Sequence, residues 1–343
     1  MSTPPSAAGS PRKILLDCDP GIDDALAIVF ACGHPGLELC GVTTVAGNVG
    51  LAQTTANALS VLDFTGRPDV PVAAGSPVPL LRPHRDARHV HGESGLGRAQ
   101  LPPPRARPVD VPATDLIIDI VGSSPGEIIL VATGPLTNIA LAVRRQPELI
   151  RQVADFVIMG GSAGRGNVTP AAEYNIATDP EAAAIVFGAG WRVTMVGLDA
   201  TLRVRADRAV QERLAGLGRL GRELLLPALG GYRAGEAETA QPGPGDGRPG
   251  GGRAGGPDDP PGAGPAVHDV CALALAAEPA LFGCVPGRIE VETAGRWTTG
   301  MTVTDFRAPA QACNALVATS VDAARFWDTV IAAWARLPVA QTA

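Results

Sequence analysis

Short apolar runs alternate along the chain with segments whose apolar residues recur every three or four positions. Runs of four to eight apolar residues predict buried strands, and the longer spacing predicts amphipathic helices. The first strand and helix are expected at 13–16 and 23–31, and further pairs follow at 37–44 and 51–62, 127–132 and 136–144, and 156–159 and 180–187, with another strand at 193–196. Repeated strand–helix units predict an α/β fold with an open, mostly parallel sheet flanked by helices.

The same pattern suggests where the folded part begins and ends. Residues 1–11 lack apolar periodicity and are expected to be a disordered tail, and residues 336–343 are expected to be a second, short tail. Between them, 12–335 is predicted to form a single domain. Glycine and proline fill most of 241–265, so this segment is predicted to be a mobile insertion. Beyond it we expect a helix at 271–277, strands at 288–292, 301–305 and 315–318, and a closing helix at 322–334.

Composition narrows the class of partner. The formal net charge of -6 and the lack of a Lys/Arg-rich block argue against binding to nucleic acid or to an anionic membrane. No apolar run approaches the roughly 20 residues that span a bilayer, and the amino terminus has no signal-peptide core. The six cysteines show no C-x-x-C spacing, so neither a zinc site nor a disulfide framework is indicated. We expect a cytoplasmic protein that binds a small molecule.

Polar clusters follow the predicted strands at their carboxyl ends, where open parallel sheets bind ligands. An acidic cluster follows the first strand, and Ala46-Gly47-Asn48, Thr133-Gly134-Pro135 and Met159-Gly160-Gly161 follow later ones. Several loops are therefore expected to converge on one rim.

The acidic cluster is the most informative feature. Asp17, Asp19, Asp23 and Asp24 fall within eight residues at a strand-to-helix turn, and like charges this close repel one another unless a cation or hydrogen-bond donors compensate. Calcium takes six to eight oxygen ligands and tolerates irregular geometry. A plain helix cap would account for Asp23 and Asp24 at a helix N-terminus, but not for Asp17 and Asp19 upstream.

The run 17–25 resembles the D-x-D-P-G-x-D-D signature of the inosine-uridine type nucleoside hydrolases. Further blocks resemble the family in family order: 43–48, 91–95, 133–138, 159–161, 173–175 and 267–269. The resemblance covers about 12–335. It implies a Rossmann-like nucleoside hydrolase fold and hydrolysis of the N-glycosidic bond of ribonucleosides to ribose and free base, in a homodimer or homotetramer.

The resemblance also implies a site, residue by residue. Calcium would be held by Asp19, Asp24, the backbone carbonyl of Thr133, and Asp269, with Asp17 supporting them from just outside. The substrate's hydroxyls would be held by Asp23, Asn48 and Asn175 at the 2′ and 3′ positions and by Asn167 and Glu173 at the 5′ position. His268 would face the base and assist its departure.

These residue types suit the reaction. Calcium lowers the pKa of a bound water, and Asp19 can act as the general base that takes its proton. Loss of the base leaves positive charge on the sugar, as in other glycoside cleavages, and carboxylates stabilise that charge. A grip on the ribose hydroxyls would make the enzyme demand ribose over deoxyribose.

The stretch before His268 departs from the family pattern. The family usually has a helix with aromatic residues here, whereas 224–233 offers only Tyr232, and Gly230-Gly231 disfavour a continued helix by about 1 kcal/mol per residue. This segment, which would close over the base as a lid, could be a mobile flap or a defect that weakens activation of the leaving base. His89 and His91 could line the pocket or only shape their loop.

Two alternatives remain at this point. One is a catalytically weak nucleoside- or ribose-binding protein with a degenerate lid. The other takes Asp17-x-Asp19 as the acidic pair of a magnesium phosphatase, although the sequence has no clear phosphate cradle.

Overall fold

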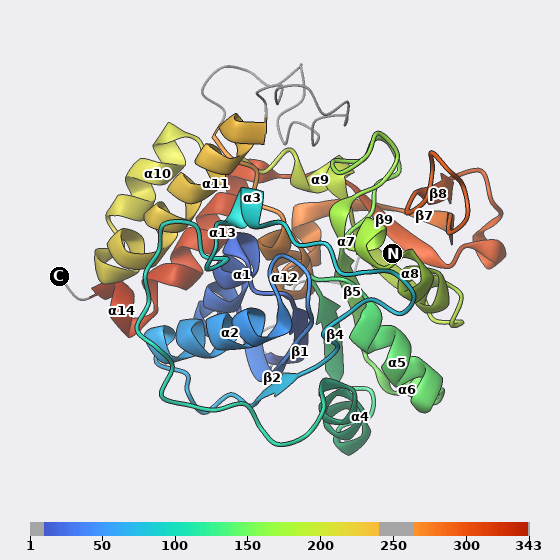
Figure 1. Ribbon diagram of the computed structural model, residues 1–343, viewed down its shortest axis with the longest axis horizontal. Helices are drawn as coiled ribbons and strands as arrows, with labels where there is room; N and C mark the ends of the chain where they lie inside the picture. Colours follow the sequence, from blue (N-terminus) through green and yellow to red (C-terminus); the bar gives the residue numbers. More distant parts are fainter. Residues whose placement is uncertain (1–9, 240–263, 342–343) are drawn as a thin grey trace.

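The computed structural model describes residues 10–239 and 264–341, and this part of the chain contains a nine-stranded sheet with helices on both faces (Figure 1). The strand order is β3-β2-β1-β4-β5-β6-β9-β7-β8. The strands are β1 (Arg12–Cys18), β2 (Leu37–Thr44), β3 (Val72–Ala74), β4 (Ile128–Ala132), β5 (Asp155–Met159), β6 (Val193–Val196), β7 (Phe282–Val291), β8 (Thr302–Asp305) and β9 (Ala315–Val321). In this order, each pair of neighbouring strands from β3 to β9 is parallel, and β7 runs antiparallel to both of its neighbours, β9 and β8.

Most helices connect these strands. The α-helices are α1 (Ile22–Gly33), α2 (Leu51–Thr65), α3 (Arg88–His91), α4 (Ala113–Ser123), α5 (Thr137–Arg145), α6 (Leu149–Gln152), α7 (Tyr174–Thr178), α8 (Pro180–Phe187), α9 (Leu198–Thr201), α10 (Arg208–Ala215), α11 (Leu226–Thr239), α12 (Asp269–Ala277), α13 (Ala323–Ala335) and α14 (Pro338–Gln341). A π-helical segment, Leu220–Leu225, precedes α11, and short 3-10 turns lie at Pro279–Leu281 and Ala310–Ala312.

Side chains of the central strands alternate between two apolar cores, one on each face of the sheet. In β1, Ile14 and Leu16 belong to one core and Leu15 to the other, and in β4 Val131 and Leu130 divide in the same way. Helices α1, α2, α12 and α13 cover the first face, while α4, α5 and α8 cover the second. Burial on both faces explains why the strands are continuous apolar runs, and the predicted α/β class is confirmed.

Several predicted elements coincide with the structure. The bounds of β2, α8 and β6 match the predicted 37–44, 180–187 and 193–196. In contrast, β7 begins six residues earlier than the predicted 288–292, because residues 283–286 are exposed and lack an apolar pattern. Neither α4 nor α10 was expected from the sequence.

Helix α11 runs without a break through Gly230-Gly231, a pair that was expected to disfavour a continued helix. The helix continues through both glycines because Gly231 packs directly on another backbone: a Cβ there would lie 2.5 Å from the Cα of Gly97. The amide of Arg98 also donates to the carbonyl of Pro227 at 3.3 Å. The cost of glycine in a helix is therefore offset by a close approach that a larger residue would prevent.

The predicted tails and insertion are only partly within the described chain. Residues 1–9 and 240–263, which include most of the predicted tail 1–11 and insertion 241–265, lie outside it. Residues 336–343 were expected to be a tail, yet α14 forms there and buries Val339 and Ala340 in the core of the first face. Among the described residues, no helix combines the length and apolar character needed to cross a membrane.

Candidate active site

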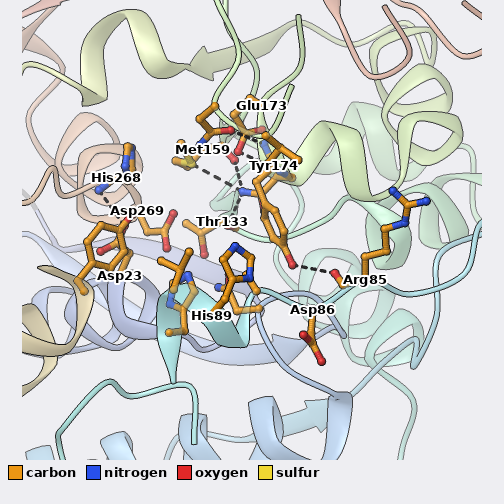
Figure 2. Close-up of a pocket in the computed structure, with 18 residues that line it drawn as sticks. Asp23, Arg85, Asp86, His89, Thr133, Met159, Glu173, Tyr174, His268 and Asp269 are labelled. Atoms are coloured by element: carbon orange, nitrogen blue, oxygen red, sulfur yellow. Dashed lines mark hydrogen bonds between the residues drawn. The ribbon is translucent and has the colours of Figure 1, made fainter. Parts of the chain in front are cut away.

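A cavity of about 310 Å³ opens at the carboxyl ends of the central strands (Figure 2). The predicted site residues that line it are Asp23, Asn48, Thr133, Asn167, Glu173, Asn175, His268 and Asp269. Two other predicted residues, Asp19 and Asp24, are fully buried and do not line it. The fold thus brings together side chains from the loops after β1, β2, β4 and β5 and from the start of α12, as the sequence predicted.

Asp24 connects these loops. It lies in the first turn of α1, and its carboxylate accepts hydrogen bonds from the amides of Asp19 and Gly21, the side chain of Asn48 and the hydroxyl of Thr133, at 2.9–3.3 Å. The helix-cap explanation therefore holds for part of its role. The remaining contacts join three separate strand ends at one carboxylate, and burial raises its pKa.

Asp17 is buried and does not line the pocket, but hydrogen bonds connect it to neighbouring elements. Its Oδ1 accepts from Thr43 Oγ1 at 2.6 Å and from Asn138 Nδ2 at 2.8 Å, and all three side chains are buried. Burial raises the pKa of Asp17 to about 7, against the lowering effect of these two donors. Thr43 and Asn138 were not singled out from the sequence, although both fall within blocks that resemble the family.

Asp19 is bordered by two glycines whose positions leave no room for a side chain. Its Oδ2 accepts from the amide of Asn48 at 2.7 Å, and its Oδ1 is buried without a hydrogen-bond partner in the described chain. A Cβ on Gly47 would lie 2.0 Å from Oδ2, and one on Gly134 would lie 2.7 Å from Oδ1. Burial, followed by the charge of Asp24, raises the pKa of Asp19 well above its usual value.

We call Asp17, Asp19, Asp24 and Asp269 the acid floor. Asp24 and Asp269 are close enough for each to influence the pKa of the other, and burial raises the pKa of Asp269 well above its ordinary value, with the charges of neighbouring aspartates adding to the effect. The carbonyl of Thr133 accepts from Asn175 Nδ2 at 2.8 Å. The four predicted calcium ligands are therefore neighbours. Asp24 is hydrogen-bonded to the amide of Asp19 and to the hydroxyl of Thr133. No three Asp, Glu, His or Cys side chains of the described residues are arranged around a common metal position.

Another side of the pocket comes from the segment between β5 and α7, where Glu173 lies (Figure 2). Glu173 caps α7: its carboxylate accepts from the amides of Gly161, Asn175 and Ile176 at 2.9–3.2 Å. Asn167 Oδ1 accepts from the amide of Tyr174 at 3.0 Å. A carboxylate has about four acceptor positions, so Glu173 retains capacity for a ligand hydroxyl.

Two buried imidazoles lie on the pocket wall. Burial lowers the pKa of His268 to about 4, with Arg205 adding to the effect, and it lowers the pKa of His91 to about 3. Both rings are therefore neutral at pH 7. His91 Nδ1 accepts from the amide of Ile22 at 3.1 Å, so this histidine both shapes the start of α1 and lines the pocket.

Tyr232 on α11 completes this wall. Its ring meets that of His91 edge to face, with centroids 5.8 Å apart, and it lines the pocket together with His89. Sequence reasoning missed Tyr174 and Arg85, which also line the pocket and are joined by a hydrogen bond from the Tyr174 hydroxyl to the Arg85 carbonyl at 3.1 Å. Tyr174 stands inside a block that resembles the family, which was the available signal.

A carboxylate floor beneath walls of amide, carboxylate and imidazole groups defines an α/β protein with a site for a small, hydroxyl-bearing ligand. The family profile described as inosine-uridine preferring nucleoside hydrolase matches residues 14–328. The chain belongs to this family, and it is a nucleoside hydrolase, an enzyme that cuts the N-glycosidic bond of ribonucleosides.

Individual relatives agree with this assignment. The chain is 43% identical over 331 residues to an inosine-uridine preferring nucleoside hydrolase of Leishmania major, covering 95% of this chain and 98% of the relative. It is 41% identical over 326 residues to a non-specific ribonucleoside hydrolase of Salmonella typhi, with the same two coverages. A solved purine-preferring ribonucleoside hydrolase from Gardnerella vaginalis superposes with a TM-score of 0.85 at 32% identity, covering 96% of this chain and 99% of that one. These findings decide against the magnesium phosphatase.

Proposed function

We propose that the chain hydrolyses ribonucleosides with the help of a calcium ion held by Asp19, Asp24, Asp269 and the carbonyl of Thr133. The observation that carries the proposal is the burial of these four residues at a pocket of about 310 Å³, which Thr133 and Asp269 line. Buried carboxylates with raised pKa values are unfavourable as neighbouring anions unless positive charge compensates them.

The donor set fits calcium. It consists only of carboxylate and carbonyl oxygens, which hard divalent cations prefer. Asp19 Oδ1 is buried without a hydrogen-bond partner among the described residues, so this oxygen is available as a ligand. When bound, calcium supplies positive charge that makes a nearby water more acidic.

The side chains of the site carry out the proton transfer and stabilise the charge that develops during bond cleavage. Asp19 accepts a proton from the attacking water, whose oxygen forms a bond to C1′ of the sugar as the bond between C1′ and the base nitrogen breaks. The electron pair of that bond leaves with the base, which takes up a proton from solvent. The surrounding carboxylates stabilise positive charge on the sugar ring while the bond order is low.

The pocket walls orient the ribose. We propose that Asp23, Asn48 and Asn175 hold the 2′- and 3′-hydroxyls, because all three line the cavity next to the acid floor. Asn167 and Glu173, on the segment between β5 and α7, hold the 5′-hydroxyl. Fixing the sugar in this way converts binding energy into orientation of C1′ toward the water.

His268 assists the departing base. The ring lines the pocket and is neutral at pH 7, so its contribution is a hydrogen bond from a ring N–H to the base nitrogen that gains the electron pair. A neutral imidazole can act as such an electrophile when its pKa is lowered.

A base-release assay tests the proposal. Inosine, adenosine, guanosine, uridine and cytidine would each be incubated with the enzyme, with and without a calcium chelator. We expect release of base from ribonucleosides that stops in chelator and returns with added calcium. Undiminished release in excess chelator would remove the metal from the account. The homodimeric or homotetrameric state and the cytoplasmic location stay predictions.

A further inference from the structure

We propose that Thr201 is a positioning residue that holds His268 in the tautomer with its proton on Nε2, facing the leaving base. The inference rests on the proposed role of His268 and adds the group that makes this role possible. Thr201 lies outside every segment that resembles the family signature, at the end of α9, 67 residues from His268 in sequence.

The geometry places one ring nitrogen against the protein and the other toward the ligand. Thr201 Oγ1 lies 2.8 Å from His268 Nδ1, and Thr201 is fully buried. His268 lines the cavity, and its Nε2 has no hydrogen-bond partner among the described residues. Nε2 is therefore the nitrogen available to a nucleoside.

The surroundings of Thr201 decide which partner donates. A hydroxyl has one proton to donate, and within the described chain the Thr201 hydroxyl has no hydrogen bond other than the one to His268. If the hydroxyl accepted Nδ1–H, its own proton would be buried without an acceptor, which is unfavourable. The hydroxyl therefore donates to Nδ1, and a neutral ring then carries its proton on Nε2.

Backbone hydrogen bonds hold together the two segments that carry Thr201 and His268. The segments that follow Thr201 and precede His268 run side by side: Val267 N donates to Val204 O, and Ala206 N donates to Pro265 O, both at 2.9 Å. The contact between Thr201 and His268 is thus held by two short, paired segments of backbone. Such a support can fix the direction of the imidazole without touching the substrate.

This arrangement defines what His268 contributes. With Nδ1 accepting from Thr201, the Nε2–H donates a hydrogen bond to the base as the electron pair of the C1′–N bond moves onto it. No proton leaves the ring, so no imidazolate forms, and the base is protonated by solvent. In the opposite tautomer, Nε2 would present a lone pair and repel the base at the same moment.

The kinetic test compares two substrates whose leaving groups differ. Inosine needs help for its base to depart, whereas p-nitrophenyl riboside has a leaving group stable as an anion. Thr201→Val keeps the shape and removes the hydroxyl, and we expect it to lower the ratio of inosine kcat to p-nitrophenyl riboside kcat about tenfold. Thr201→Ser retains the hydroxyl and should restore the ratio to within about twofold of wild type.

Thr65→Val is the matched control. Thr65 is buried, donates its hydroxyl to the carbonyls of Val61 and Leu62 in α2, and does not line the pocket. The same chemical change should leave the substrate ratio unaltered. A ratio lowered equally by Thr65→Val would overturn the inference, because the effect would then come from loss of any buried hydroxyl.

A second measurement does not depend on activity. Nitrogen NMR of the imidazole rings distinguishes protonated from bare ring nitrogens, and the signal of His268 is identified by its loss in His268→Ala. We expect a bare Nδ1 and a protonated Nε2 in the wild-type enzyme at neutral pH, and a change of this pattern in Thr201→Val. A protonated Nδ1 in the wild type would overturn the inference.

The failure of this inference is separable from failure of the proposed function. If His268→Ala lowers kcat for inosine far more than kcat for p-nitrophenyl riboside, but Thr201→Val does not, Thr201 has no positioning role while His268 keeps its own. If His268→Ala itself slows both substrates equally, the proposed role of His268 fails, and the role of Thr201 fails with it.

Discussion

Different interactions hold together the acid floor of the pocket and the wall that α11 forms. The acid floor is polar, and hydrogen bonds from the ends of β1, β2 and β4 converge on it. The wall at α11 depends instead on close packing, where Gly231 approaches Gly97 and Tyr232 meets His91 edge to face. The acid floor therefore depends on the charge and hydrogen bonding of its side chains. The wall depends on how closely the two backbones can approach.

The difference teaches where each region is vulnerable. A change of charge in the floor alters the site without requiring any change of volume, since the surrounding donors remain in place. A change of volume at the wall shifts α11 relative to α3, which contains His91, and relative to the loop that follows α3. We therefore expect floor variants to lose catalysis with the fold intact, and wall variants to lose stability first.

The largest effect is expected in the floor. Asp24→Asn removes the negative charge and keeps only one of the two acceptor oxygens, so we expect kcat for inosine to fall by about 10³-fold or more. Asp207→Asn is the matched control, because Asp207 caps α10 through the amide of Val210 without lining the pocket. Near wild-type turnover by Asp24→Asn would show that the floor is not catalytic.

The grip on the sugar should give the next largest effect. We expect kcat/KM for 2′-deoxyinosine to lie below that for inosine by on the order of 10³-fold, because the buried polar groups assigned to the 2′-hydroxyl would lose a partner. Parallel base-release assays on the two substrates measure the ratio. Equal efficiencies would exclude the assignment of Asp23 and Asn175 to that hydroxyl.

His268, which lines the pocket, should have an intermediate effect. We expect His268→Ala to lower kcat for inosine about 10²-fold and to lower that for p-nitrophenyl riboside far less, since only the first base needs a hydrogen bond to depart. Steady-state kinetics with both substrates provide the check. An equal loss on both would mean that the ring only shapes the pocket.

The smallest effects, and the ones that sharpen the comparison most, come from two adjacent glycines in α11. A Cβ on Gly230 meets nothing within 4 Å, whereas a Cβ on Gly231 meets the backbone of Gly97 at 2.5 Å. We expect Gly230→Ala to raise the free energy of unfolding by about 0.5–1 kcal/mol and Gly231→Ala to lower it by about 1–3 kcal/mol. Denaturant unfolding measures both. Equal changes in the two variants would contradict the close-packing account.

The same contrast explains what could be predicted from the sequence. Asp17, Asp19 and Asp24 follow an apolar strand and form a distinctive acidic cluster, so a site could be expected there from the sequence, whereas Asp269 was placed with them only by the family resemblance. The α/β class followed from alternating apolar runs. Helix α11 could not be predicted, because its two glycines oppose helix formation locally and only contact with Gly97 reverses that preference. The role of Thr201 could not be predicted either, because a single threonine indicates nothing about function until its distance to His268 is known.

The central claim is that the acid floor binds calcium, and a calorimetric titration tests it most directly. Calcium would be titrated into chelator-stripped wild-type enzyme and into the Asp24→Asn and Asp207→Asn variants. We predict a single site per chain in the wild type and in Asp207→Asn, and loss of that site in Asp24→Asn. The account is contradicted if the wild type binds no calcium while it still releases base from inosine in excess chelator.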